Sequence, residues 1–238
     1  MDEARRFLRY VMPGLSFIVQ MVLFLWLLIP TWTQDNVLHP IVNSGIGLAT
    51  ILLFGSGGIG FIFGVIHHHV HAHFGSVDQA GTVNRLRGRN IIRLIDTESG
   101  NEFNNGYRIT RLNAWIIVTA IWHERIKTNK KIKSANTRTD SLADMTHSTG
   151  TARVASVCAW LLTLGIAMNT FQISFKGVDI LHFVIMNMIA FMLMTVFHCA
   201  YKRTGASVER VVEGVLFDAL VDERRISKDA VEIYVAPG

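Results

Sequence analysis

Four long apolar runs divide this chain, and they constrain its fold more than any other feature of the sequence. The runs are Val11–Ile29, Ile41–Ile66, Val154–Phe171 and Val178–Phe197. Each is long enough to cross the roughly 30 Å hydrocarbon core of a bilayer as a helix. We therefore expect an all-α membrane protein with four transmembrane helices, which form two hairpins and make the lipid bilayer its first partner.

The distribution of Lys and Arg predicts the orientation of these helices. Twelve Lys and Arg residues and four acids lie between residues 84 and 139. The opposite side of the expected membrane carries Asp35, His39, Lys176 and Asp179. Because cytoplasmic loops are enriched in Lys and Arg, we expect a multi-pass protein of the inner or plasma membrane with both termini and the central segment in the cytoplasm.

The positions of the apolar runs predict four consecutive regions. Residues 1–66 form the first hairpin, 67–152 a basic cytoplasmic loop, 153–198 the second hairpin, and 199–238 a cytoplasmic helix and strand. The first hairpin is joined by residues 30–40. The loop and the tail together are long enough to form a small folded domain, which we expect to be α+β.

Local patterns predict the elements of that domain. Ile91–Ile95 is strand-like and is followed by turn residues and Tyr107–Thr110, which predicts a hairpin. The segment Leu112–Lys133 has an apolar start and a basic end, which predicts a helix. Apolar residues between 208 and 220 repeat at helical spacing, and Val231–Val235 predicts a strand that could extend the hairpin.

Small residues in the second run predict close helix packing. Ser56, Gly60 and Gly64 are four residues apart and share one helix face. This face could line a pore or associate with another subunit, or it could contact a neighbouring helix of the same chain. The interior polar candidates for a pore are Gln20, His182 and Asn187.

Histidines at the end of the second run could bind a metal. His67, His69, His71 and His73 share a face on a strand, and pairs of them share a face on a helix, which would suit zinc or another divalent ion. The alternative is a polar collar at the membrane interface. A second constellation, Glu124, Asp144 and His147, resembles half of a di-metal carboxylate site. The alternative is a solvated helix leading into the third run.

The basic loop predicts an anion-binding surface. Its candidate ligand-binding residues are Arg85, Arg87, Arg89, Arg93, Lys130 and Lys131. Such residues could contact the phosphates of a nucleotide or short nucleic acid. Anionic lipid headgroups are the alternative partner.

These features favour a pore or a membrane-disrupting effector that is regulated by an anionic ligand. Four spans per chain are few for a transport path within one subunit, so we expect a homo-oligomer, with a tetramer as one candidate assembly. An effector of bacterial anti-phage defence would have this layout. The alternatives are a metal-dependent membrane enzyme and a non-catalytic anchor for a cytoplasmic protein. The absence of a P-loop, nucleophile elbow or HExxH motif favours a protein that is not an enzyme.

Overall fold

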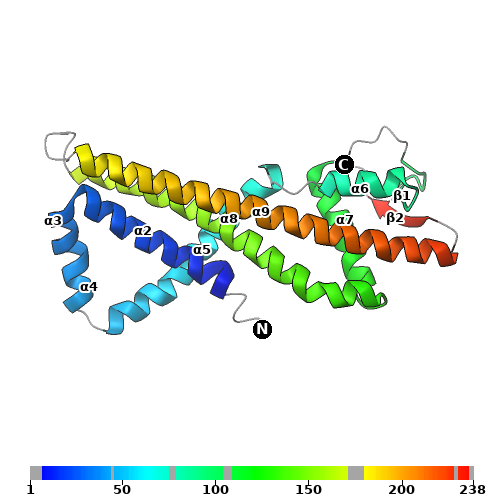
Figure 1. Cartoon of the computed structure of the whole chain (residues 1–238), viewed down its shortest axis with the longest axis horizontal. Coiled ribbons are helices and arrows are strands. Elements are labelled where there is room, and N and C mark those ends of the chain that lie inside the picture. The colour runs from blue at the N-terminus through cyan, green and yellow to red at the C-terminus, as the bar shows by residue number, and fades with distance from the viewer. Residues whose placement is uncertain are drawn as a thin grey trace. The chain divides into compact units, whose positions relative to one another are not determined.

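The computed structural model describes residues 7–43, 46–74, 79–103, 109–170, 180–227 and 230–235. It is 85% helical and contains a two-stranded sheet (Figure 1). The elements in chain order are η1 (Phe7–Val11), α2 (Met12–Leu28), α3 (Pro30–Thr33), η2 (Gln34–Leu38), α4 (His39–Asn43), α5 (Ile46–Phe74), α6 (Gln79–Gly88), β1 (Ile92–Asp96), α7 (Arg111–Arg125), α8 (Lys130–Thr170), α9 (Ile180–Ser227) and β2 (Val231–Val235).

The chain forms two compact units. Unit 1 contains residues 1–70 and 144–204, and unit 2 contains residues 71–143 and 205–238. The helices α8 and α9 each contribute to both units. Unit 2 thus combines most of the central segment with the C-terminal tail.

Three helices of the described chain are long and apolar enough to cross a membrane. They span Arg9–Leu28, Lys130–Asn169 and Ile180–Arg224. These helices overlap the first, third and fourth apolar runs of the sequence. The second run falls on α4 and α5, and residues 44–45 and several side chains of α5 lie outside the described residues.

Within unit 1, the connection expected at residues 30–40 is helical. The helix α2 ends at Leu28, and the next residue, Ile29, has non-helical angles, with φ at −140° and ψ at 64°. A residue before proline is sterically biased away from helical angles, so Pro30 explains this break. Pro30 then begins α3, and η2 and α4 continue to Asn43.

Small residues of α8 form the interior of unit 1. Ala155, Ala159 and Thr163 are fully buried, and Ala167 is 9% exposed. Their spacing of four residues places them on one helix face. The cluster around them includes Phe17 and other apolar residues of α2, together with residues of α5 and α9. Side chains this small let neighbouring helices approach closely, which is how helices associate where lipid supplies no hydrophobic driving force.

In unit 2, the helix expected over Leu112–Lys133 is two helices. Thr110 caps α7, because its hydroxyl accepts a hydrogen bond from the Asn113 N–H at 3.2 Å. The side chain of Asn129 accepts from the Lys131 N–H at 2.9 Å and therefore caps α8. The prediction of one helix was wrong because Asn129 stabilises a second start.

The sheet of unit 2 also differs from the expected hairpin. The strand β1 pairs in parallel with β2, with Ile92 opposite Val231 and Asp96 opposite Val235 (Figure 1). The expected partner strand 107–110 falls partly outside the described residues, and residues 109–110 are not in a strand. The strand prediction for Val231–Val235 is confirmed. The sheet packs on a core drawn from every element of unit 2, including Leu86, Leu94, Ile117, Ile132, Leu216 and Leu220.

Candidate functional site

The predicted anion-binding arginine Arg85 is already bound by a carboxylate of its own chain. Its Nε lies 2.6 Å from Glu213 Oε1 and its Nη2 lies 2.7 Å from Glu213 Oε2. Glu209 Oε1 lies 3.7 Å from the same guanidinium. Both glutamates belong to α9, where they are four residues apart and so share a face. The geometry with Glu213 is bidentate, which is the strongest form of this pair.

Two more cations of unit 2 meet carboxylates of α9. Lys131 Nζ lies 2.7 Å from Asp222 Oδ2. Arg125 Nε donates to Glu223 Oε2 at 3.0 Å and its Nη1 lies 2.7 Å from Glu124 Oε1. Burial of Arg125 favours its neutral form, but the two carboxylates outweigh burial and raise the pKa of its guanidinium above the ordinary value.

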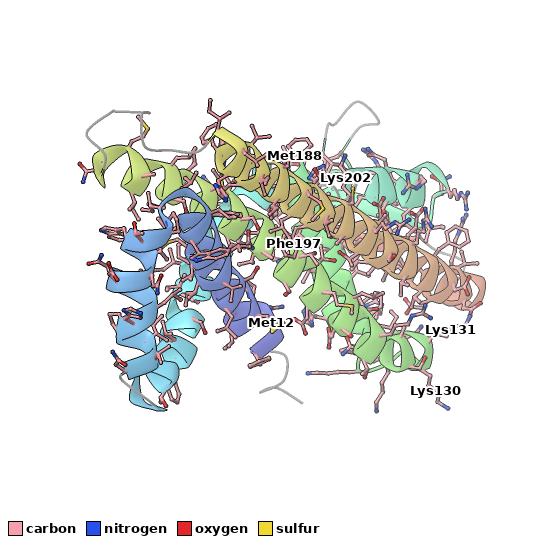
Figure 2. All side chains as sticks on the ribbon, turned by 60° about the vertical axis from the view of Figure 1, so that its left-hand side comes forward. Met12, Lys130, Lys131, Met188, Phe197 and Lys202 are labelled. Atoms are coloured by element: carbon pink, nitrogen blue, oxygen red, sulfur yellow. The ribbon has the colours of Figure 1, made fainter. Side chains whose placement is uncertain are left out.

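The other predicted anion-binding residues have varied surroundings. Arg87 is buried and donates to the carbonyl of Phe103. The guanidinium of Arg89 lies 4.7 Å from the centre of the Phe217 ring. Arg93 is exposed on β1, and Lys130 is exposed at the start of α8, where its side chain extends from the helix end (Figure 2). The structure therefore presents Arg93 and Lys130 on the surface and engages the other four within unit 2.

Sequence reasoning missed the acids of α9. They are Glu209, Glu213, Asp218, Asp222 and Glu223, and we call them the α9 carboxylates. A signal for them was available, since Glu209 and Glu213, and also Asp218 and Asp222, are four residues apart and flank the apolar positions of the same helix.

The small face of α5 packs against the N-terminal helix of the same chain. A β-carbon added at Gly60 would overlap the carbonyl of Tyr10, and one added at Gly14 would overlap the carbonyl of Ser56. A β-carbon at Gly64 would touch the Tyr10 ring at 3.3 Å. In the structure, the face of Ser56, Gly60 and Gly64 therefore contacts a neighbouring helix of the same chain, which is one of the two interpretations of these small residues.

The polar residues considered for a pore occupy different environments. Gln20 is buried, and its amide donates to Ser16 Oγ at 2.7 Å. Asn187 accepts from Trp160 Nε1 at 3.0 Å, which joins α9 to α8. The side chain of His182 is exposed on α9. Gln20 and Asn187 thus contribute hydrogen bonds to the interior of unit 1.

Of the predicted metal-binding histidines, His67 is buried and His69 is exposed. The His67 ring packs on the backbone of Gly150 and meets the rings of Tyr201 and His147 at 5.4 and 5.9 Å between centroids. The side chains of residues 71 and 73 lie outside the described residues. Within the part of the chain that the structure describes, no group of three or more His, Cys, Asp or Glu could hold a metal ion.

The second metal hypothesis combines residues of different units. Glu124 belongs to unit 2 and is paired with Arg125. Asp144 and His147 belong to unit 1, where Asp144 Oδ1 lies 2.5 Å from Arg9 Nη2. Asp144 and His147 are on the helix that leads into the third apolar run. Asp144 is buried rather than solvated, which differs from the alternative reading.

No family model, curated protein or solved structure matches this chain. The ion pairs of unit 2 are therefore the strongest guide to its chemistry. Phosphate and carboxylate groups both present paired oxygens to the donor fork of an arginine.

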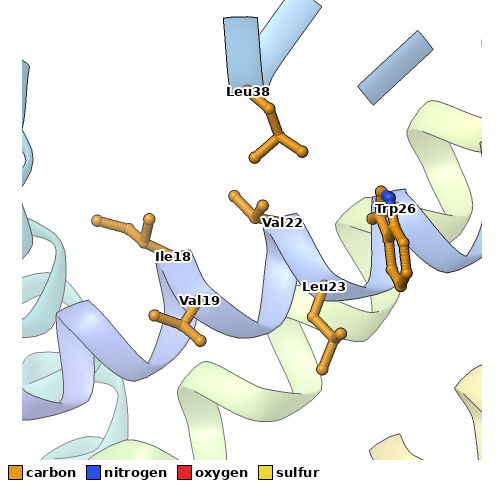
Figure 3. Close-up of a pocket in the computed structure, with 6 residues that line it drawn as sticks. All are labelled: Ile18, Val19, Val22, Leu23, Trp26 and Leu38. Carbon is orange, nitrogen blue, oxygen red and sulfur yellow. The ribbon is translucent and has the colours of Figure 1, made fainter. Parts of the chain in front are cut away.

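A groove on unit 1 has no such polar chemistry. It lies between α2 and η2 and encloses about 390 Å³ (Figure 3). Its lining is entirely apolar and consists of Ile18, Val19, Val22, Leu23, Trp26 and Leu38. Because α2 is a candidate membrane span, this surface suits the hydrocarbon of a lipid tail.

Proposed function

We propose that the protein is an oligomeric membrane pore or membrane-disrupting effector, regulated by an anionic ligand that binds unit 2. The chain crosses the inner or plasma membrane four times, and both termini and the central segment lie on its cytoplasmic side. The ligand is a nucleotide or short nucleic acid, and an anti-phage response is a setting that would use such a protein. Three apolar helices of spanning length and the basic character of the central segment support this reading.

The observation that carries the proposal is the bidentate pair between Arg85 and Glu213. Arg85 comes from the basic central segment and Glu213 from α9. The N-terminal part of α9 belongs to a candidate membrane span. A phosphate that replaces Glu213 on Arg85 therefore removes a restraint from the helix that also forms a span.

The energetics allow such an exchange. The Arg85 side chain is 47% exposed and that of Glu213 is 31% exposed, so the pair is worth only about 0.2–1 kcal/mol. A ligand with several phosphates gains a charge-assisted bond at each further cation of unit 2 that it reaches. The α9 carboxylates would then compete with the ligand for the cations of unit 2, and this competition would set the ligand concentration needed for a response.

Two substitutions test this mechanism. In Glu213→Gln, Arg85 loses its bidentate carboxylate and keeps only the more distant Glu209, so binding of a labelled oligonucleotide to the purified protein should tighten several-fold. In Arg85→Gln, binding should weaken. Membrane potential, followed with a voltage-sensitive dye during induced expression, should change in Glu213→Gln relative to the wild type. Glu98→Gln provides a matched control, because Glu98 is an exposed acid of the same unit with no ion pair among the described residues.

The proposal fails if inserted wild-type and Glu213→Gln proteins both leave the potential unchanged in the presence of the oligonucleotide. Changed potential with unaltered oligonucleotide binding would retain the pore and reject the ligand. The substitution of Gly60, by contrast, tests packing within one chain, because its face contacts Tyr10.

A second candidate function, an anchor for a cytoplasmic protein, is favoured by one feature of α7. Trp115 and Ile116 are adjacent and are 45% and 51% exposed. An exposed tryptophan beside an exposed aliphatic residue is typical of an anchor residue at an interface. The anchor predicts a stable complex that is lost in Trp115→Ser, and no change of membrane potential in any variant.

A further inference from the structure

Among the described residues, the backbone groups on the outer edge of β2 have no hydrogen-bond partner. In the ladder with β1, the Val231 N–H donates to the Ile91 carbonyl at 2.9 Å and the Thr97 N–H donates to the Val235 carbonyl at 3.1 Å. Together with the register of the two strands, these bonds direct the backbone of alternate residues toward β1. The backbone groups of Glu232 and Tyr234 consequently point away from β1.

The two edges of this sheet differ. Beyond β1, the Phe103 N–H donates to the Leu94 carbonyl and the Asp96 N–H donates to the Asn101 carbonyl, both at 2.9 Å. This segment closes the β1 edge. Among the described residues the sheet ends at β2, and no backbone group is bonded to its outer side.

The β2 edge has few of the features that protect edge strands, since its short length and the single charged residue Glu232 are the ones present. Its sequence, Val-Glu-Ile-Tyr-Val, contains no proline or lysine, and all five residues are in register with β1 without a bulge. Three of the five are β-branched and one is aromatic, which favours strand pairing. A two-stranded sheet is marginal by itself, so additional strands would stabilise it.

We propose that the β2 edge pairs with the β2 edge of a second copy of this chain, in antiparallel orientation and centred on Ile233. A two-fold axis produces this arrangement, because an isologous contact brings the same surface of both copies together. Glu232 of one copy then lies opposite Tyr234 of the other. These are the two residues whose backbone N–H and C=O groups point away from β1. The pairing therefore makes four backbone hydrogen bonds without altering β1.

The exposed face of β2 is complementary to itself in this register. The Tyr234 hydroxyl donates to Glu232 Oε2 at 3.3 Å within one strand, so the two side chains already point to the same side. Tyr234 is 63% exposed. In the antiparallel pair each Tyr234 phenol also faces the Glu232 carboxylate of the other copy, so a donor meets an acceptor across the two strands. On the other face, Val231, Ile233 and Val235 remain packed on the core of unit 2.

Tyr234→Pro is the first test. Its N–H points away from β1, so proline removes an outward donor and keeps every bond of the β1–β2 ladder. Tyr234→Thr is the matched control, because threonine retains the N–H and a β-branched side chain. We expect the mass of the full-length protein in detergent, measured by light scattering, to fall for Tyr234→Pro at concentrations where Tyr234→Thr and the wild type remain associated. A tenfold or larger increase in the dissociation constant is expected.

Cysteine pairs test the register even if Tyr234→Pro does not fold. In a Cys158→Ala, Cys199→Ser background, Glu232→Cys and Tyr234→Cys are made in separately tagged chains and expressed together in membranes. Opposed residues have α-carbons about 5.5 Å apart, within disulfide range, whereas two Glu232 positions are more than about 7 Å apart. Oxidation should therefore join the two different chains several-fold more often than two identical ones.

The inference is overturned if the wild type is monomeric in detergent and in membranes, if Tyr234→Pro folds and associates like Tyr234→Thr, or if crosslinks form without preference for unlike chains. These outcomes are separate from membrane potential. Loss of ion flux with intact β2 pairing would reject the pore and keep the interface.

Discussion

The imidazole ring of His67 packs directly on the backbone of Gly150, so that a β-carbon at residue 150 would overlap the ring. His67 is 1% exposed and is also held by the rings of Tyr201 and His147. We therefore expect Gly150→Ala to destabilise unit 1 by about 1–3 kcal/mol, the usual cost of overpacking. Unfolding of the purified protein in detergent, followed by tryptophan fluorescence, measures the change.

The same helix supplies a control for that prediction. A β-carbon at Gly165 would meet no heavy atom within 4 Å, so Gly165→Ala should be at least as stable as the wild type, since alanine also favours the helix more than glycine does. In the background of Gly150→Ala, the additional change His67→Ala should recover part of the loss because it removes the ring. Equal effects of Gly150→Ala and Gly165→Ala would contradict the packing described for His67.

Gly60 is expected to be more sensitive, because its neighbour is backbone. Gly60→Ala would place a β-carbon on the carbonyl of Tyr10, and the two helices must separate to accept it. We expect a loss of about 3 kcal/mol, measured by denaturant unfolding in detergent. Gly58→Ala is the matched substitution on α5, since nothing lies within 4 Å of a β-carbon there. If Gly60→Ala and Gly58→Ala were equally stable, the close crossing at Tyr10 would be wrong.

The pair of Arg85 and Glu213 predicts a measurable coupling. A double-mutant cycle with Arg85→Gln and Glu213→Gln should give about 0.2–1 kcal/mol, because both side chains are partly exposed. The exchanged variant, Arg85→Glu with Glu213→Arg, should unfold at nearly the wild-type denaturant concentration. Each reversal alone should be less stable than the exchange. Additive effects in the cycle would show that the two groups do not interact in solution.

Asp96 predicts a dependence of stability on pH. The hydroxyl of Ser99 and the N–H of Glu98 donate to its carboxylate and lower its pKa below the ordinary value of 3.8. A lowered folded pKa means that the stabilisation is complete above the unfolded value and is lost as the pH falls through the folded pKa. Ser99→Ala should move the pKa of Asp96 upward, which a ¹³C NMR titration of the carboxyl group would detect. An unmoved titration would exclude Ser99 as the main cause.

Hydropathy predicted the apolar helices of this chain because spanning length is a property of a continuous run. The first, third and fourth runs coincide with helices of spanning length in the structure. The packing in the interior of unit 1 was harder to predict from the sequence, although a sequence signal for it was present. Ser56 and Gly60 are not the only small residues with this spacing, because Ala155, Ala159 and Thr163 are also four residues apart on α8 and are fully buried.

The contacts of unit 2 could not be obtained from local patterns. A strand at 92–96 and a strand at 231–235 each have a local signature, but their parallel pairing depends on how the intervening helices return the chain. The excess of basic over acidic residues in the central segment predicts an anion-binding surface, but it does not reveal which basic residues pair with acids of the same chain. Their partners lie far along the chain, as with Arg85 and Glu213, which are 128 positions apart.

The separation of the two strands has a consequence for biosynthesis. At ordinary translation rates, β1 leaves the ribosome roughly 7–27 s before β2 has been made. During that time the apolar parts of α8 and α9, which lie between the two strands in the sequence, must be inserted into the membrane. Until β2 is made, Leu94 and its neighbours in the nascent central segment remain exposed to solvent. A chaperone would therefore be needed most at this stage of synthesis.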